Sequence, residues 1–213
     1  MSVTIYGMAV TRAGRCLWAA EELGIGYDHK PINMFAGEHK APDYLAINPN
    51  GKVPALTDGK LTLFESLAIN LYLAETYGKT SLQPKDAAGR TIANQWSMWV
   101  LTECEKPLLA AILHTFGIMG YEKSQAKVDE QRAALEPQLG VLNAALNGRD
   151  YLLGAEFTIA DLNVASVFQW GQGAGFNWAP HSNVEAWLGR CFSRPAFGKV
   201  AAMVQADMAK MNG

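Results

Sequence analysis

Strand-forming patterns are confined to the first eighty residues of this 213-residue chain, and this division limits the folds it can adopt. In that part, short runs of period two, such as SVTIYG (residues 2–7), alternate with helical patterns such as residues 11–23. Their order is strand, helix, strand, helix, strand, strand, helix. After a polar connection, residues 79–90, only helical patterns follow. The sequence therefore predicts an α/β domain, residues 1–80, followed by an all-α domain, residues 86–213.

Two prolines fall inside the long helical patterns of the second part. Residues 91–116 and 121–146 have helical periodicity, and they contain Pro107 and Pro137. Proline lacks the N–H needed for a helical hydrogen bond, and its ring clashes with the preceding turn. Each helix should therefore bend or be interrupted near its proline.

The segment FTIADL, residues 157–162, predicts the start of another helix. Thr158 can cap this helix, and Asp161 can reach back to the capping backbone N–H. Phe157 and Leu162 occupy the positions of a hydrophobic staple. Asp161 could also be a catalytic acid, but the pattern favours a structural role.

Charge and composition argue against several classes of partner. The formal net charge of −2 and the pI of about 6.1 give no reason to expect nucleic acid or an anionic membrane. No apolar stretch approaches the ~20 residues of a membrane helix, and the N-terminus lacks the features of a signal peptide. The widely spaced Cys16, Cys104 and Cys191 favour unpaired thiols in a cytoplasmic protein over disulfides or a zinc site.

NPNGKVPAL, residues 48–56, places Pro54 directly before an apolar run that predicts a strand. Proline cannot donate to a sheet and is confined to edges, first strand positions or bulges. A cis Val53–Pro54 bond would turn the chain there and leave the backbone groups of Val53 free to pair with an extended peptide. A trans proline that protects a sheet edge explains the same stretch equally well.

A second compact signal is LFESLAIN, residues 63–70. Ser66 begins a predicted helix, whose free N–H groups and dipole attract an anion. Glu65 offers a carboxylate that could hold an ammonium group. The pair could bind an α-amino acid, although a capping serine with a chance acidic neighbour is the simpler explanation.

Three cationic residues and one hydroxyl could extend this receptor. His39, Lys40 and Lys52 could meet a second carboxylate, or they could be solvated surface charges. His39 has no clustered histidine beside it, so no metal is expected. Thr11 could cap the helix that follows it, or its hydroxyl could donate a hydrogen bond to an anionic sulfur.

Together these features describe a receptor for a short peptide with an amino-acid head, a central thiol and a terminal carboxylate, which is a description of glutathione. The whole chain resembles the cytosolic glutathione S-transferases, and YGMAVTRAGRCLWAAEELG is nearest to their serine-type and bacterial branches. NPNGKVPAL resembles the cis-proline loop of the family, FES its γ-glutamyl site and FTIADL the staple of its helical domain. The resemblance implies a thioredoxin-like first domain.

The resemblance also implies roles for individual residues. Thr11 would donate a hydrogen bond to the sulfur, at a position where the family more often has serine. Tyr6 is the candidate donor of the tyrosine-type branches, but the spacing to Arg15 fits the serine-type pattern better. The residues that would bind glutathione are His39, Lys40, Lys52, Val53, Pro54, Glu65 and Ser66.

The implied activity is conjugation of glutathione, as co-substrate, to small hydrophobic electrophiles, with peroxide reduction as a side activity. A dedicated glutathione-dependent isomerase or dehalogenase, and a non-catalytic transferase-like binding protein, are the alternatives. A homodimer is implied by analogy. Plausible walls of the electrophile pocket are Met8, Val10, Glu105 and Leu109.

Overall fold

The structure is a computed structural model that describes residues 3–79 and 82–212, with side chains through Lys210. Ser2, in the predicted first strand, and residues 80–81, in the predicted connection, lie outside the described residues. The chain forms two compact units, one of residues 1–83 and 193–213 and the other of residues 84–192.

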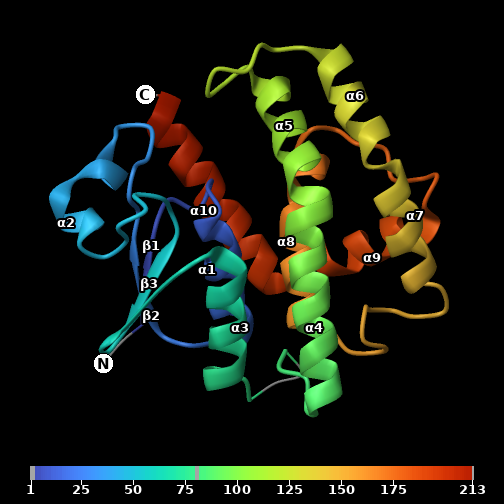
Figure 1. The fold of residues 1–213 in the computed structure, drawn as a ribbon, viewed down its shortest axis with the longest axis horizontal. Helices are drawn as coiled ribbons and strands as arrows, with labels where there is room; N and C mark the ends of the chain where they lie inside the picture. The colour runs from blue at the N-terminus through green and yellow to red at the C-terminus, as the bar shows by residue number, and fades with distance from the viewer. Residues whose placement is uncertain (1–2, 80–81, 213) are drawn as a thin grey trace. The chain divides into compact units, whose positions relative to one another are not determined.

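The first unit has the predicted thioredoxin-like order of strands and helices (Figure 1). Its strands form one sheet in the order β2-β1-β3-β4, with β1 parallel to β2 and antiparallel to β3. The predicted hairpin pairs Ala55 with Phe64 at one end and Asp58 with Leu61 at the other. The elements are β1 Val3–Tyr6, α1 Ala13–Leu23, β2 Tyr27–Lys30, the 3₁₀ turn η1 Glu38–Lys40, α2 Pro42–Leu45, β3 Ala55–Asp58, β4 Leu61–Phe64 and α3 Ser66–Tyr77.

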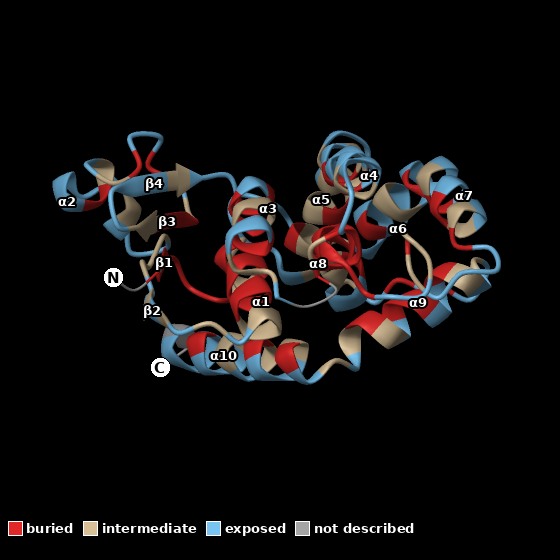
Figure 2. Cartoon of the chain, turned by 90° about the horizontal axis from the view of Figure 1, so that it is seen from below, coloured by how far each residue is buried: buried red, intermediate tan, exposed pale blue. Residues whose placement is uncertain are grey.

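The core of this unit follows from the apolar spacing of its helices. The spacing predicts an apolar face on α1 of Ala13, Cys16, Leu17, Ala20 and Leu23. The first four are completely buried, and Leu23, at the end of the helix, is partly buried. Figure 2 shows buried residues along α1 and α3. Because these helices pack on each other and on the sheet, residues at the start of both are held in fixed positions.

The second unit is helical in its described residues. Its elements are α4 Ala87–Trp99, the π-helical turn η2 Val100–Cys104, α5 Glu105–Phe116, α6 Gln125–Ala134, α7 Glu136–Ala145, α8 Ile159–Gly173 and α9 Ser182–Phe192. Both predicted interruptions are present. The π turn ends at Cys104, shortly before Pro107, and the break between α6 and α7 falls at Leu135, shortly before Pro137. A widened or broken turn relieves the clash of each proline ring with the carbonyl four residues earlier.

The FTIADL segment begins α8 with the predicted capping box. The fully buried Asp161 carboxylate accepts hydrogen bonds from the Thr158 backbone and hydroxyl, from the Leu152 N–H and from Trp187 Nε1. Burial raises the pKa of Asp161, and these donors oppose that shift. The carboxylate therefore connects three segments of the helical unit, and its role is structural.

The last helix, α10 (Pro195–Asn212), groups with the first unit, whereas the sequence analysis placed all residues from 86 to 213 in the helical domain. It runs along α1 (Figure 1), where Phe197 contacts the Trp18 ring at a centroid distance of 4.9 Å. Arg194 forms two hydrogen bonds of 2.7 Å to Glu22. Helical periodicity predicts that these residues form a helix but does not identify its packing partner.

The structure also bears on the predictions for the cysteines and for membrane-spanning helices. Cys16, Cys104 and Cys191 are buried thiols. Within residues 3–79 and 82–212, no helix combines the length and the apolar character needed to cross a membrane.

Candidate functional site

The Val53–Pro54 peptide bond is cis, so the alternative of a trans proline is wrong. The pairing of β1 with β3 begins at Tyr6 and Ala55, and Val53 therefore lies outside the ladder. The loop before it is fixed by the Lys52 carbonyl, which accepts hydrogen bonds of 2.7 Å from the Tyr44 hydroxyl and from Asn48 Nδ2. This arrangement provides a rigid backbone segment beside the sheet.

Glu65 occupies an unusual backbone conformation between β4 and α3. Its φ of 71° and ψ of 107° are rare for a residue with a β-carbon. Strain of this kind costs about 1–3 kcal/mol and is concentrated at functional sites. Ser66, the first residue of α3, is buried, and no side chain caps the helix. The first N–H groups of α3 have no acceptor within the helix, and they lie directly after the Glu65 carboxylate.

Arg15 belongs to this site, and the sequence analysis gave it no binding role. Its side chain is only 4% exposed, and its Nη1 lies 3.3 Å from the Ser66 hydroxyl oxygen. A guanidinium beside the N-terminus of α3 adds positive charge to a position that already favours an anion. In the sequence, the indication that Arg15 is buried is its position between Ala13 and Cys16, which are both buried in α1.

Cys16 is close to the same turn but is not a nucleophile. Its sulfur lies 3.5 Å from the Ser66 carbonyl oxygen. Complete burial raises the pKa of the Cys16 thiol far above its usual range, although Arg15 opposes the shift. The thiol therefore remains protonated and serves packing between α1 and α3.

The Thr11 hydroxyl has two partners in the loop between β1 and α1. It donates a hydrogen bond of 2.7 Å to the Met8 carbonyl and accepts one of 3.2 Å from the Ala13 N–H. In this conformation the hydroxyl stabilises the loop and the start of α1. To donate to a sulfur, it would have to exchange the Met8 carbonyl for the new acceptor.

Tyr6 has its hydroxyl oriented toward the sheet. The oxygen lies 3.4 Å from Thr57 Oγ1 of β3, and the buried ring packs near Tyr44 and Ala55. This placement favours Thr11 over Tyr6 as the candidate donor.

Three of the predicted elements meet at the beginning of α1. A β-carbon built on Gly7, directly after β1, would lie 2.8 Å from Ala13 Cβ and 3.0 Å from Val53 Cβ. The hydrogen bond between Arg15 and Ser66 adds the start of α3 to the same region. The structure thus brings three segments together. They are the loop of residues 7–12 between β1 and α1 (the Thr11 loop), the loop of residues 46–54 between α2 and β3 (the Val53 loop) and the Glu65–Ser66 turn.

Of the three predicted cationic residues, His39 and Lys40 lie beside the Val53 loop and Lys52 lies within it. A β-carbon on Gly51 would lie 2.8 Å from Lys40 Nζ and 3.1 Å from the His39 carbonyl, so η1 packs against this loop. Lys40 and Lys52 are exposed, whereas His39 is partly buried. Within the part of the chain that the structure describes, His39 Nδ1 is buried and has no hydrogen-bond partner.

The candidate electrophile residues fall on both units. Met8 is buried and Val10 is partly buried in the first unit. Glu105 and Leu109 are partly buried on α5 of the second unit. A pocket formed by these four residues stays a prediction.

Comparisons with known proteins agree along most of the chain. The family model described as "Glutathione S-transferase, N-terminal domain" matches residues 1–75, and the corresponding C-terminal domain model matches residues 102–195. Glutathione S-transferase F13 of Arabidopsis thaliana is 35% identical over 212 residues, covering 94% of this chain and 95% of the relative. Glutathione S-transferase 4 of Zea mays is 32% identical over 205 residues, covering 94% and 92%.

Solved structures show the same similarity. Glutathione S-transferase I bound with lactoylglutathione has a TM-score of 0.85 and 32% identity, covering 95% of this chain and all of the other. The maize enzyme in complex with an atrazine glutathione conjugate has a TM-score of 0.85 and 31% identity, covering 96% and 99%.

Proposed function

The chain belongs to the glutathione S-transferase family, and from this premise we infer that it conjugates the thiolate of glutathione to small hydrophobic electrophiles. The observation that carries the site assignment is the meeting of three segments at the start of α1. These segments are the Thr11 loop, the Val53 loop and the Glu65–Ser66 turn. We assign the chain to the serine-type branch, with Thr11 in place of the usual serine.

In the proposed complex the γ-glutamyl group binds at the start of α3. Its carboxylate accepts hydrogen bonds from the first N–H groups of the helix and from the Ser66 hydroxyl, and the Arg15 guanidinium contributes positive charge. The Glu65 carboxylate holds the ammonium group. An amino-acid head is therefore recognised by both of its charges.

The remainder of the tripeptide extends along the Val53 loop. The backbone of Val53 pairs with the cysteinyl part, in the manner of an added strand. His39, Lys40 and Lys52 approach the glycyl carboxylate. Two charged ends and a backbone pairing between them fix the position of the central sulfur.

Thr11 acts on the sulfur as a hydrogen-bond donor. A free cysteine thiol has a pKa near ~8.5, and lowering it by about two units requires ~2.7 kcal/mol of preferential thiolate stabilisation. A hydrogen bond to a charged group contributes about 1.5–3 kcal/mol, and a helix dipole about 0.3–1 kcal/mol. These contributions suffice without a general base. The thiol proton passes to solvent. The thiolate then forms a carbon–sulfur bond with the electrophile, either by displacing a leaving group such as a halide or by adding to a polarised double bond that afterwards takes up a proton.

The proposed function also includes an electrophile pocket, an assembly state and a location. Met8, Val10, Glu105 and Leu109 would form the electrophile pocket, and peroxide reduction would be a side activity of the same thiolate. A homodimer is supported by the exposed Leu61 and Phe64 on β4, an edge strand that leaves both backbone and apolar groups uncovered. Three cysteines that form no disulfide support a cytoplasmic location.

The decisive experiment measures glutathione binding and thiolate formation in the Thr11→Ala variant. Wild type should be retained on immobilised glutathione and show the ultraviolet absorbance of a bound thiolate near neutral pH. Thr11→Ala should raise the pH midpoint of thiolate formation by about one unit or more, since a charged hydrogen bond is lost. Thr11→Ser should restore the wild-type midpoint.

Thr91→Ala is a matched control. Its hydroxyl also donates to a backbone carbonyl, that of Ala87, but it lies on α4 in the other unit. An unchanged midpoint in Thr11→Ala would remove Thr11 from the mechanism. Retention of wild type without any thiolate would identify a non-catalytic binding protein, and absence of retention would contradict both the enzyme and the binder.

A further inference from the structure

The C-terminal helix reaches the loop that carries Thr11. The Ala9 N–H donates a hydrogen bond of 2.6 Å to Asp207 Oδ2, across 198 positions of sequence. Asp207 lies on α10 and is only 6% exposed, and Ala9 is equally inaccessible at 3%. A carboxylate near the C-terminus of the chain is therefore enclosed against the segment between β1 and α1.

Ala9 is also confined on its carbonyl side. A β-carbon on Gly14 of α1 would lie only 2.4 Å from the Ala9 carbonyl oxygen and 3.8 Å from Val200 Cγ1 of α10. A side chain at position 14 is thus incompatible with this packing. The peptide groups on both sides of Ala9 are fixed, one by α10 and the other by α1.

Hydrogen bonds connect the other residues of the loop, from Gly7 to Thr11, to the fixed peptide groups of Ala9. The Met8 carbonyl accepts hydrogen bonds from both the backbone N–H and the hydroxyl of Thr11. Before it, the Gly7 N–H donates to the Lys30 carbonyl of β2 at 2.8 Å. Because Thr11 follows Ala9 by two residues, a displacement of Ala9 would move the Thr11 hydroxyl.

The contact is stronger than an ordinary loop hydrogen bond. A buried carboxylate costs free energy unless its oxygens have donors. A hydrogen bond from an N–H to a charged oxygen is about twice as strong as a neutral one. An apolar residue at position 207 would avoid the cost of burying a charge but could not accept a hydrogen bond from the Ala9 N–H.

We propose that Asp207 is a positioning residue of the thiol site, which holds the Met8–Thr11 loop so that the Thr11 hydroxyl meets the sulfur of bound glutathione. This inference rests on the proposed function. It makes α10 a supporting element of the glutathione site, although none of its residues contacts the tripeptide in the proposal. Other contacts, such as Lys199 with Glu21 at 2.7 Å, attach the same helix to α1 without touching the loop.

The test compares Asp207→Ala, Asp207→Leu and Asp207→Asn with wild type. We expect the Ala and Leu variants to lower kcat/KM by about tenfold or more, because a misplacement of ~1 Å at a reacting group can cost ~100-fold. They should also raise the pH midpoint of thiolate formation on bound glutathione. The Asn variant keeps an oxygen acceptor for Ala9 and should recover most of the activity. The Leu variant fills the same space, so it keeps the test decisive if the Ala variant fails to fold.

Lys199→Gln is the matched control on the same helix. It loosens α10 from α1 and should leave the midpoint and kcat/KM unchanged, even where its melting temperature falls. Wild-type midpoints in the Ala and Leu variants would overturn the proposal, as would an equal loss of activity in Lys199→Gln. Failure of wild type to bind glutathione would instead overturn the proposed function, so the two failures are distinguishable.

Discussion

At the scale of single residues, Glu65 combines backbone strain with the proposed role of binding an ammonium group. A residue with a β-carbon is held at positive φ between an edge strand and the first turn of α3. Neighbouring structure must stabilise this conformation, because it costs about 1–3 kcal/mol. In return, the chain turns within one residue from β4 into a helix whose first N–H groups follow a carboxylate. A residue with a relaxed backbone conformation at position 65 would increase the stability of the fold and weaken the binding of glutathione.

Glu65→Gly is therefore expected to increase the free energy of unfolding by about 1 kcal/mol, because relief of ~1–3 kcal/mol of strain exceeds the ~0.5–1 kcal/mol entropic cost of glycine. The same variant should bind glutathione more weakly. Urea unfolding and calorimetric titration would measure the two effects. Glu65→Gln, which keeps the strain and loses the charge, should weaken binding without stabilising the protein. A Gly variant with wild-type stability and affinity would contradict this account.

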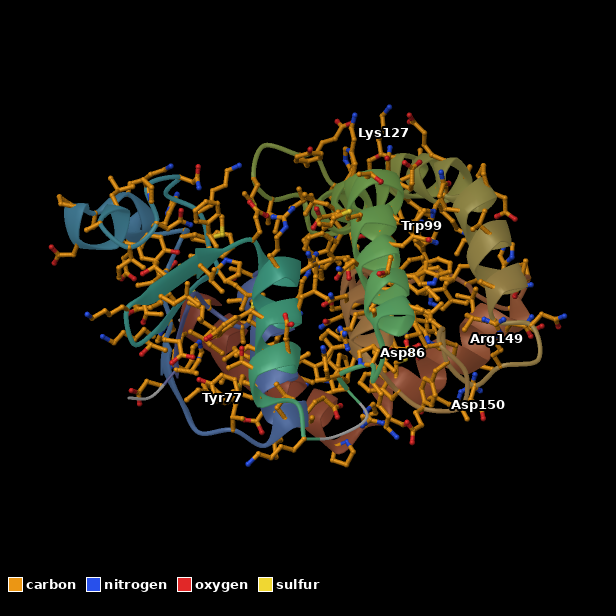
Figure 3. All side chains as sticks on the ribbon, turned by 60° about the horizontal axis from the view of Figure 1, so that its bottom comes forward. Tyr77, Asp86, Trp99, Lys127, Arg149 and Asp150 are labelled. Atoms are coloured by element: carbon orange, nitrogen blue, oxygen red, sulfur yellow. The ribbon has the colours of Figure 1, made fainter. Side chains whose placement is uncertain are left out.

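At the scale of elements, Asp58 attaches the β3–β4 hairpin to α3. Its carboxylate accepts hydrogen bonds from the hydroxyls of Tyr72, at 2.8 Å, and of Tyr77, which lies near the end of α3 (Figure 3). These donors lower the pKa of Asp58. The hydrogen bond to Asp58 and partial desolvation raise the pKa of Tyr77 to about 12. The segment from Asp58 to Tyr77 is thus a closed loop that contains the Glu65–Ser66 turn.

Tyr77→Phe should lower the free energy of unfolding by about 1 kcal/mol near neutral pH, the contribution of one such hydrogen bond. The folded pKa of Asp58 lies below its unfolded value of ~3.9. Its contribution is therefore present above that value and lost as pH falls through the lower folded pKa. Tyr77 has the opposite sign, so its contribution is complete below ~10 and is lost as pH rises toward 12.

Urea unfolding of wild type and of Tyr77→Phe, from below pH ~3.9 to about pH 12, would measure the effect. The difference between wild type and Tyr77→Phe should shrink at both extremes. Tyr121→Phe, at an exposed tyrosine of the other unit, should match wild type throughout. A pH-independent difference would contradict the assigned role of the hydrogen bond between Tyr77 and the Asp58 carboxylate.

At the scale of the whole molecule, each of the two compact units has its own stabilising contacts. The residues proposed to bind glutathione all belong to the first unit, which also contains α10. Asp161 belongs to the second unit, where its carboxylate has backbone, hydroxyl and indole donors. Stability and glutathione binding can therefore be altered separately.

Asp161→Ala is expected to reduce the free energy of unfolding by about 3 kcal/mol or more, since several buried donors lose their acceptor at ~1–3 kcal/mol each. The folded fraction should bind glutathione with wild-type affinity, because the site lies in the other unit. Thermal unfolding and titration at a temperature where the variant is folded would test both statements. Asp129→Ala, on the exposed surface of α6, should change neither. A large loss of affinity in Asp161→Ala would show that the two units are coupled.

Much of this protein can be predicted from local sequence patterns. The order of elements, the capping box at Thr158 and the interruptions before Pro107 and Pro137 are confirmed from local patterns alone. Each depends on residues only a few positions apart, whose conformations are limited by sterics and by local hydrogen bonds. Such constraints are present before the chain has folded. The cis Val53–Pro54 bond is confirmed too, but the local stretch left it open and only the resemblance to the family favoured it.

The contacts that complete the site depend on residues far apart in sequence, and only the tertiary structure decided them. Arg15 lies at the proposed amino-acid site because α1 packs beside the start of α3. Asp207 reached Ala9 because α10 returned to the first unit, although its periodicity was equally compatible with the helical one. Periodicity specifies that a helix has an apolar face, but several buried surfaces can cover that face. Which one does so, and which buried polar group then finds its partner, is settled by the packing of the whole chain.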